Sequence, residues 1–480
     1  MKRLYLDWGV ISNLKKKEYA VLQNFFLSHK DRLFYVYSPA HIDDLKRSEG
    51  DSRLTEDLKT LTNLVGDHLL TFNKKDVTAY RATPSLYYDL HKNDPPIRLA
   101  EFGNVLSSLD SSIPDRLRIG SRIKELLQAI SFPVPKVILS NTYWDTLLPE
   151  LPAKPSILDV IQSAGLFVDR MQDEEKYYKN YRSDIHDKGF KLDVNAGNWT
   201  DKEAIPNISV FLESKGIKKS FMELVKMPFS ERKSISDYEV FVAAYTMLDL
   251  LGYHSDKLSK PGSTINGLLS DAQHAFMASY CDYFITEDRR LAAKAKALYI
   301  EFGIETIVLA PSDVETVLQE DLKSYDSKYF FSFLHQEINR LDAKVERHMK
   351  ENDQDSFYDI YYFTHRLLGI FPRGFLYEQS IERKDHILLL DMGKGRSTSF
   401  LFFDEVAMIV DLLFTYLSAE PIHDYESIKE ALVRGDTSIS VIWTIRGGRI
   451  VLKNNEASHK PELIVVIGVD NAFTSSTKSD

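Results

Sequence analysis

Short, largely apolar runs alternate with amphipathic stretches over the first 80 residues. The runs Arg3–Leu6 and Leu33–Tyr37 predict two strands. Glu18–Ser28 and Thr55–Val65 carry apolar residues at helical spacing, and His68–Phe72 predicts a third strand. Strands that alternate with helices favour a parallel sheet with right-handed crossovers. Residues 1–80 are therefore predicted to form the first half of an α/β domain.

Helical spacing dominates the next part of the chain, residues 81–264. The stretches Arg116–Ile130, Ser156–Val168 and Tyr238–Leu251 each predict a helix. Breaks that contain proline and lysine separate such stretches, and no internal repeat is visible. This part is predicted to be a large helical insert.

The alternation of helix and strand returns over residues 265–318. Asp271–Tyr280 predicts a helix that Ser270 caps, and Tyr283–Thr286 predicts a strand. These residues are expected to complete the sheet domain that the helical insert interrupts.

Residues 319–480 are predicted to form a separate unit, helical at first and α+β afterwards. Tyr329–Met349 and Gln354–Leu368 have aromatic and apolar residues at helical spacing. Strands are predicted further on, at Ile387–Leu390, in a hairpin over Val441–Leu452 and at Leu463–Val469.

The length and composition describe a multidomain globular protein. At 480 residues, two or three domains are expected. No apolar run reaches the roughly 18 residues of a membrane helix, and no signal-peptide pattern opens the chain. Cys281 is the only cysteine, which excludes an internal disulfide and a cysteine-based zinc site. We therefore expect a protein of the reducing cytoplasm that has no membrane partner.

The charge balance argues against broad, non-specific binding of nucleic acid, because the net charge is −10. Basic residues are nevertheless clustered: Lys15–Lys17 follow the first strand, and Arg289 and Arg290 follow a later one. Each cluster is consistent with a solvated helix face or with one wall of a local basic groove.

Four aspartates occupy positions where a divalent cation could bind. Asp7 follows the first strand, and Asp44 follows the second apolar run and is predicted to open a helix. Asp271 is predicted to begin a later helix, and Asp288 follows the strand at Tyr283–Thr286. The carboxyl ends of parallel strands meet at one edge of a sheet, so these acids are expected to converge. Oxygen ligands of this kind suit Mg²⁺ or Mn²⁺.

These segments resemble the PIN-domain nucleases. The pieces that carry the resemblance are Leu6-Asp7-Trp8-Gly9, Ser38-Pro39-Ala40-His41-Ile42-Asp43-Asp44-Leu45, Ser270-Asp271-Ala272 and Phe284-Ile285-Thr286-Glu287-Asp288. The family pattern ends in Thr-x-Asp, and the resemblance covers about a quarter of the chain. Its second acid is usually Glu, whereas here Asp43 and Asp44 compete for the role. We favour Asp44, which directly precedes the apolar Leu45.

The resemblance implies a PIN-like parallel sheet flanked by helices and a Mg²⁺- or Mn²⁺-dependent endonuclease. Asp7, Asp44, Asp271 and Asp288 would hold the metal, and Thr286 would bond a carboxylate or a water at the catalytic site. RNA, single-stranded in particular, is the substrate that the family favours over DNA. A non-catalytic PIN-like module that binds RNA or protein, and a structure-specific DNA nuclease, remain the alternatives.

Two histidines and the C-terminal unit complete the expectations. His41 and His274 each lie three residues from an acid, on the same helical face. Each could orient a carboxylate, touch a phosphate or move a proton, or it could be a hydrogen-bonded histidine at a pocket edge. Residues 319–480 leave open a homo-oligomer or a protein partner.

Overall fold

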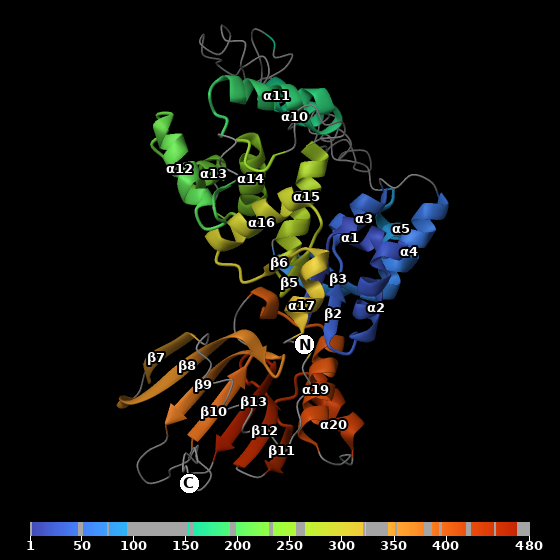
Figure 1. Ribbon diagram of the computed structural model, residues 1–480, viewed down its shortest axis with the longest axis vertical. Coiled ribbons are helices and arrows are strands. Elements are labelled where there is room, and N and C mark those ends of the chain that lie inside the picture. The colour runs from blue at the N-terminus through green and yellow to red at the C-terminus, as the bar shows by residue number, and fades with distance from the viewer. Residues whose placement is uncertain are drawn as a thin grey trace, which may run out of the picture. The chain divides into compact units, whose positions relative to one another are not determined.

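The fold is that of a computed structural model of the chain, shown in Figure 1. It describes residues 2–46, 51–73, 76–93, 152, 157–192, 198–229, 234–255, 265–319, 322, 344–350, 353–378, 386–392, 396–418, 424–445 and 448–467. The predicted helix Arg116–Ile130 lies outside these residues.

The described residues form a mixed α/β protein that divides into two compact units. The first unit contains residues 1–87, 274–292 and 302–480, and the second contains residues 88–273 and 293–301. The residues from 302 onward therefore group with the N-terminal sheet residues.

A four-stranded parallel sheet lies in the first unit, with strand order β2-β1-β5-β6. Its strands are β1 (Lys2–Leu6), β2 (Leu33–Val36), β5 (Tyr283–Ile285) and β6 (Ile307–Leu309). All five residues of β1 are buried, as is usual for a central strand of a parallel sheet that is covered on both faces. The prediction that distant segments complete one parallel sheet is confirmed.

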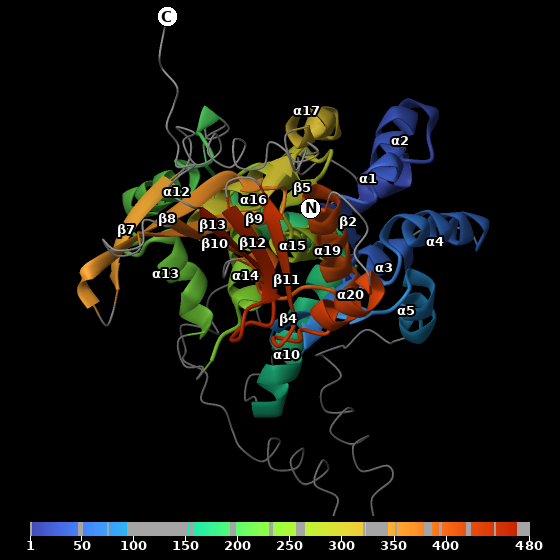
Figure 2. The same cartoon turned by 90° about the horizontal axis from the view of Figure 1, so that it is seen from below.

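Helices follow the strands of this sheet, and α3 to α5 lie together in Figures 1 and 2. Their bounds are α1 (Trp8–Asn13), η1 (Lys17–Tyr19), α2 (Ala20–Ser28), α3 (Pro39–Lys46), α4 (Asp51–Val65), α5 (Pro84–His91), α16 (Arg289–Glu301), η6 (Pro311–Asp313) and α17 (Val314–Leu318). The predicted third strand is present as β3 (His68–Asn73), but it pairs antiparallel with β4 (Asp76–Arg81). It meets the parallel sheet through a single parallel bridge between Tyr37 and Leu69.

The second unit is helical in its described part, as the sequence predicts for the insert. Its helices are α10 (Ile157–Asp173), α11 (Glu175–Asp187), α12 (Ala204–Ser214), α13 (Phe221–Lys226), η5 (Met227–Phe229) and α14 (Asp237–Leu250). Asp249 of α14 lies buried between Arg182 and Lys294, each 3.0 Å from a carboxylate oxygen, and accepts a hydrogen bond from Tyr178. Helix α15 (Ile265–Ala278) and helix α16 each begin in one unit and end in the other.

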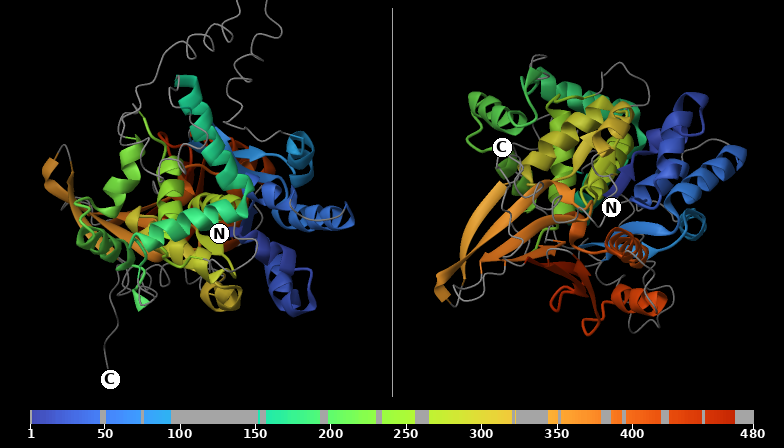
Figure 3. Two further views of the ribbon diagram at one scale, coloured as in Figure 1. Left: turned by 90° about the horizontal axis from the view of Figure 1, so that it is seen from above. Right: turned by 60° about the horizontal axis from the view of Figure 1, so that its bottom comes forward.

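A seven-stranded antiparallel sheet forms the C-terminal part of the first unit, in the order β11-β12-β13-β10-β9-β8-β7. Figure 3 shows it in orange to red. Its elements are β7 (Lys344–Lys350), β8 (Asp353–Leu367), β9 (Phe371–Glu378), β10 (His386–Asp391), η8 (Arg396–Thr398), α19 (Phe403–Leu417), α20 (Tyr425–Val433), β11 (Ser440–Ile445), β12 (Gly448–Asn454) and β13 (Pro461–Ile467). Helix α19 packs against β11, where the rings of Phe414 and Trp443 lie 5.2 Å apart.

The helical prediction for the start of this region is wrong. Gln354–Leu368 falls on strand β8, and residues 344–349 of the predicted helix Tyr329–Met349 fall on strand β7. Aromatic residues favour strands when a neighbouring strand covers them, and β8 pairs with both β7 and β9. The strands β10 and β13 and the β11-β12 hairpin are confirmed.

A candidate metal centre at the edge of the parallel sheet

The site begins where β1 and β5 end side by side. Leu6 pairs with Ile285 in the sheet register, and the backbone N–H of Asp7 donates to the carbonyl of Ile285 at 2.9 Å. Asp7 and the residues after Ile285 therefore leave the sheet at the same edge, as expected for adjacent parallel strands.

Thr286 links two of the predicted acids at this edge. Its buried hydroxyl lies 2.9 Å from Asp7 Oδ2 and accepts a hydrogen bond of 3.1 Å from the backbone N–H of Asp288. A carboxylate oxygen accepts, so the Thr286 hydroxyl donates to Asp7. One oxygen of Asp7 is thus held by the residue that directly follows strand β5.

Asp288 itself is exposed and has a local role. Its Oδ1 accepts hydrogen bonds from the backbone N–H groups of Arg290 at 2.7 Å and Leu291 at 3.0 Å. These bonds cap the first turn of α16, the ordinary task of an aspartate at that position. The capping of α16 alone is therefore a sufficient reason for an aspartate at position 288.

Asp44, and not Asp43, lies against the buried core of the site. Asp44 Oδ2 is 2.9 Å from Nε2 of His274, and its side chain is 17% exposed. Asp43 is 46% exposed and pairs with Lys46 at 3.2 Å, on the solvent side of α3. The prediction that Asp44 opens the helix is wrong, because α3 already begins at Pro39, a residue suited to the first turn of a helix. Leu45 after Asp44 is fully buried, which is consistent with the inward orientation of this part of the helix.

Behind Asp44 lies a fully buried polar cluster of Tyr5, Ser38, His41 and His274. The Tyr5 hydroxyl is 2.6 Å from Ser38 Oγ and 2.8 Å from His274 Nδ1. His41 Nε2 is 2.8 Å from the carbonyl of Leu6, and its Nδ1 accepts the backbone N–H of Ser38 at 3.1 Å.

The hydrogen bonds of His41 identify it as a neutral imidazole. A carbonyl can only accept, so Nε2 carries the proton, and Nδ1 is an acceptor for Ser38. Burial and the nearby His274 lower the pKa of His41 from 6.5 to about 3. His41 is thus the hydrogen-bonded buried histidine of the alternatives considered, and it ties α3 to the end of β1.

The electrostatics of Asp7 couple it to the neighbouring acids. Burial raises the pKa of Asp7, and the charges of Asp44 and Asp288 raise it further. His274 and the Thr286 hydroxyl act in the opposite direction. The carboxylate of Asp7 is therefore held close to other negative charge in a poorly hydrated position, where a cation would relieve the repulsion.

Asp271 differs from its prediction. Helix α15 begins at Ile265, so Asp271 lies in the middle of the helix and does not begin it. Ile265 and Leu268 are buried and extend the apolar face upstream of Ser270, which explains the earlier start. Asp271 lies one turn before His274 but belongs to the second unit, and its approach to the other acids stays a prediction.

The parts of the first unit that the structure describes also contain one group of three residues with ligand atoms within 4.8 Å of one another: Asp67, His68 and Asp404. No local pattern in the sequence reveals this group, because Asp404 lies 336 residues from His68. Arg81 contacts Asp67 at 2.9 Å and Asp404 at 3.5 Å. Its guanidinium already supplies positive charge to both acids, so an ion-pair cluster explains this group.

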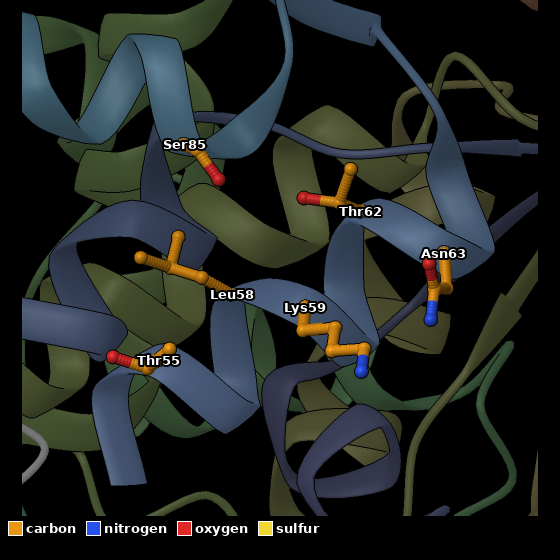
Figure 4. A pocket seen from close by; sticks show the side chains of 6 residues that line it. All are labelled: Thr55, Leu58, Lys59, Thr62, Asn63 and Ser85. Atoms are coloured by element: carbon orange, nitrogen blue, oxygen red, sulfur yellow. The ribbon is translucent and has the colours of Figure 1, made fainter. Parts of the chain in front are cut away.

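A hollow of about 350 Å³ lies between α4 and the start of α5 (Figure 4). It is lined by Thr55, Leu58, Lys59, Thr62, Asn63 and Ser85. None of the four predicted acids lines it, so it is separate from the edge that carries Asp7.

No helix among the described residues is long and apolar enough to cross a membrane. Comparisons of the chain with protein-family models, with curated proteins and with solved structures find no match.

Proposed function

We propose that the chain is a metal-dependent nuclease that hydrolyses phosphodiester bonds and whose metal ligands include Asp7 and Asp44. The observation that carries the proposal is the pair of carboxylates at one sheet edge, each with one oxygen held by a buried donor. Thr286 holds Asp7 at 2.9 Å, and His274 holds Asp44 at 2.9 Å. Metal-binding carboxylates are ordinarily fixed in this way by a second layer of hydrogen bonds.

The donor set fits a hard divalent cation. Carboxylate oxygens suit Mg²⁺ or Mn²⁺, and the pKa of Asp7 is raised by burial and by the neighbouring acids, although His274 and the Thr286 hydroxyl act against this rise. Asp288 already uses Oδ1 to cap α16. We therefore assign it a supporting role as a metal ligand, together with Asp271. When bound, the cation would polarise the phosphodiester and lower the pKa of a water.

The residues of the chain would do the remaining work. Asp7 and Asp44 would orient the cation at the edge of the sheet, and Thr286 would keep Asp7 in a fixed rotamer. The exposed Lys16 and Lys17, after α1, offer positive charge to a phosphate backbone. Single-stranded RNA is the substrate we favour, on the resemblance to PIN-domain nucleases, and the reducing cytoplasm is the compartment.

End-labelled single-stranded RNA and DNA of one sequence, incubated with the protein and Mn²⁺, Mg²⁺ or EDTA, test the proposal. We expect RNA cleavage with either metal, none with EDTA, and none with Asp7→Asn. Cleavage of DNA alone would identify the DNA nuclease alternative. Binding of RNA without cleavage of any substrate would identify a non-catalytic module and overturn the proposal.

A further inference from the structure

A chain of buried hydrogen bonds runs from the start of α3 to Asp44 and passes through three elements that are far apart in sequence. Ser38 Oγ contacts the Tyr5 hydroxyl at 2.6 Å, that hydroxyl contacts His274 Nδ1 at 2.8 Å, and His274 Nε2 contacts Asp44 at 2.9 Å. Ser38, Tyr5 and His274 are at most 1% exposed, while Asp44 is 17% exposed. The chain therefore ends where the site opens toward solvent.

The direction of each hydrogen bond follows from its neighbours. Asp44 accepts as a carboxylate, so His274 Nε2 carries a proton. His41 Nδ1 already accepts from the Ser38 backbone and lies 3.4 Å from the Tyr5 oxygen, whereas His274 Nδ1 lies 2.8 Å from it. These distances favour the arrangement in which the Tyr5 hydroxyl donates to His274 Nδ1. The Ser38 hydroxyl then donates to Tyr5, and all three bonds point toward Asp44.

We propose that His274 is a positioning residue for the metal centre, which holds Asp44 Oδ2 in place through an Nε2 proton that the Tyr5 hydroxyl directs to that nitrogen. This inference rests on the proposed function, because it explains the buried hydrogen bonds by the proposed metal ligand at their end, Asp44. His274 is 1% exposed and has no access to substrate, so it acts through the acids of the site and not on the substrate itself.

Packing alone does not account for the arrangement. Four polar side chains in a fully buried cluster gain little stability over apolar residues of similar volume. The Tyr5 ring already packs on Phe284 at 5.8 Å, a contact that phenylalanine would preserve without the hydroxyl. The hydroxyl serves the polar contacts with Ser38, His41 and His274, and of these the bond to His274 leads on to Asp44, an acid of the site.

Asp7, the other acid of the site, is also held in place by a buried side chain. Thr286 donates to Asp7 Oδ2 and receives the Asp288 N–H, so its direction is fixed as well. Partners of this kind typically change metal affinity by about 10- to 100-fold when they are removed.

A metal-free measurement tests the hydrogen-bond chain itself. Nitrogen NMR of the full-length protein with ¹⁵N-labelled histidine, at pH 8, is expected to show His274 with the proton on Nε2 and an unprotonated, hydrogen-bonded Nδ1. Tyr5→Phe is expected to move the Nδ1 resonance and leave His186, in the second unit, unchanged. A proton on Nδ1 would overturn the inference without touching the proposed function.

Mn²⁺ binding, followed by electron paramagnetic resonance, tests the purpose of the chain. His274→Leu is expected to raise the Mn²⁺ Kd by about 10- to 100-fold, and Tyr5→Phe by less. His274→Gln, whose amide can donate to Asp44 and accept from Tyr5, is expected to recover most of the affinity. Near-ultraviolet circular dichroism of each variant checks that it is folded.

The outcomes separate the two claims. If wild-type protein binds Mn²⁺ and folded His274→Leu binds it equally well, the positioning role is refuted and the proposed function stands. Equal losses in the Leu and Gln variants also refute the role, since a hydrogen bond to Asp44 then makes no difference. If wild-type protein binds no Mn²⁺ at all, the proposed function fails and the inference fails with it.

Discussion

The ion pair between Arg3 and Glu405 joins the parallel sheet to the first turn of α19, and its removal should destabilise the protein strongly. The two charges lie 2.6 Å apart, and their side chains are 1% and 5% exposed. Arg3 also donates to the carbonyls of Tyr280 and Phe400, both at 2.9 Å. Its Nε is buried and has no hydrogen-bond partner. Glu405 is therefore the carboxylate that pairs directly with the guanidinium, and the charge of Asp282 adds to its effect.

Glu405→Met keeps most of the side-chain volume and leaves the buried Arg3 without its direct ion-pair partner. Removing one partner of a buried pair costs about 3–5 kcal/mol. The loss of the hydrogen bond from the Phe402 N–H to Glu405, 3.3 Å in the intact protein, adds to that cost. We expect the free energy of unfolding to fall by about 3–5 kcal/mol.

Urea unfolding followed by tryptophan fluorescence measures this loss. The double variant Arg3→Met/Glu405→Met should recover most of it, because a packed apolar pair replaces a buried ionic pair at little cost. Glu430→Met is the matched control: Glu430 is 62% exposed and pairs with Arg434 on the surface of α20, so its loss should cost under about 0.5 kcal/mol. A loss below 1 kcal/mol in Glu405→Met, or a double variant as unstable as the single one, would refute the reasoning.

Three other changes have expected outcomes. Because the pKa of His41 is about 3 when folded and about 6.5 when unfolded, its neutral form stabilises the fold above pH 6.5, and this contribution is lost as the pH falls toward 3. The free energy of unfolding of the wild-type protein, measured with urea, should fall by about 2 kcal/mol between pH 7 and pH 5 because of His41. The His41→Gln variant should lack this pH dependence. Asp7→Asn should raise the metal-free free energy of unfolding by about 1 kcal/mol while abolishing activity, because burial and neighbouring acids disfavour the charged form of Asp7; a lower thermal midpoint would contradict this. Asp249→Ala should destabilise the second unit by about 3–5 kcal/mol, since it leaves Arg182 and Lys294 as buried positive charges, and protection of α14 from hydrogen exchange should fall accordingly.

The parallel sheet could be predicted from the sequence because its signals are local. Each strand is a short apolar run, and Asp7 and Thr286 mark the points where β1 and β5 end. Adjacent parallel strands then bring these two residues to one edge without any further information.

Other features depend on contacts that no local pattern reveals. The aromatic residues at Gln354–Leu368 fit helical spacing as well as strand spacing, and only pairing with β7 and β9 makes the segment a strand. The bond between His274 and Asp44 spans 230 residues, and that between Arg3 and Glu405 spans 402. Neither the positioning of Asp44 nor the attachment of residues 319–480 to the sheet could be derived from spacing alone.

The central claim is that Asp44 is a metal ligand of a nuclease, and its neighbour Asp43 provides the sharpest control. Asp43 and Asp44 are chemically identical and adjacent, but Asp43 pairs with Lys46 and Asp44 with the buried His274. Single-turnover cleavage of labelled single-stranded RNA in Mn²⁺ should be at least about a hundredfold slower in Asp44→Asn and unchanged in Asp43→Asn. Equal rates in the two variants, or wild-type cleavage that persists in EDTA, would contradict the assignment.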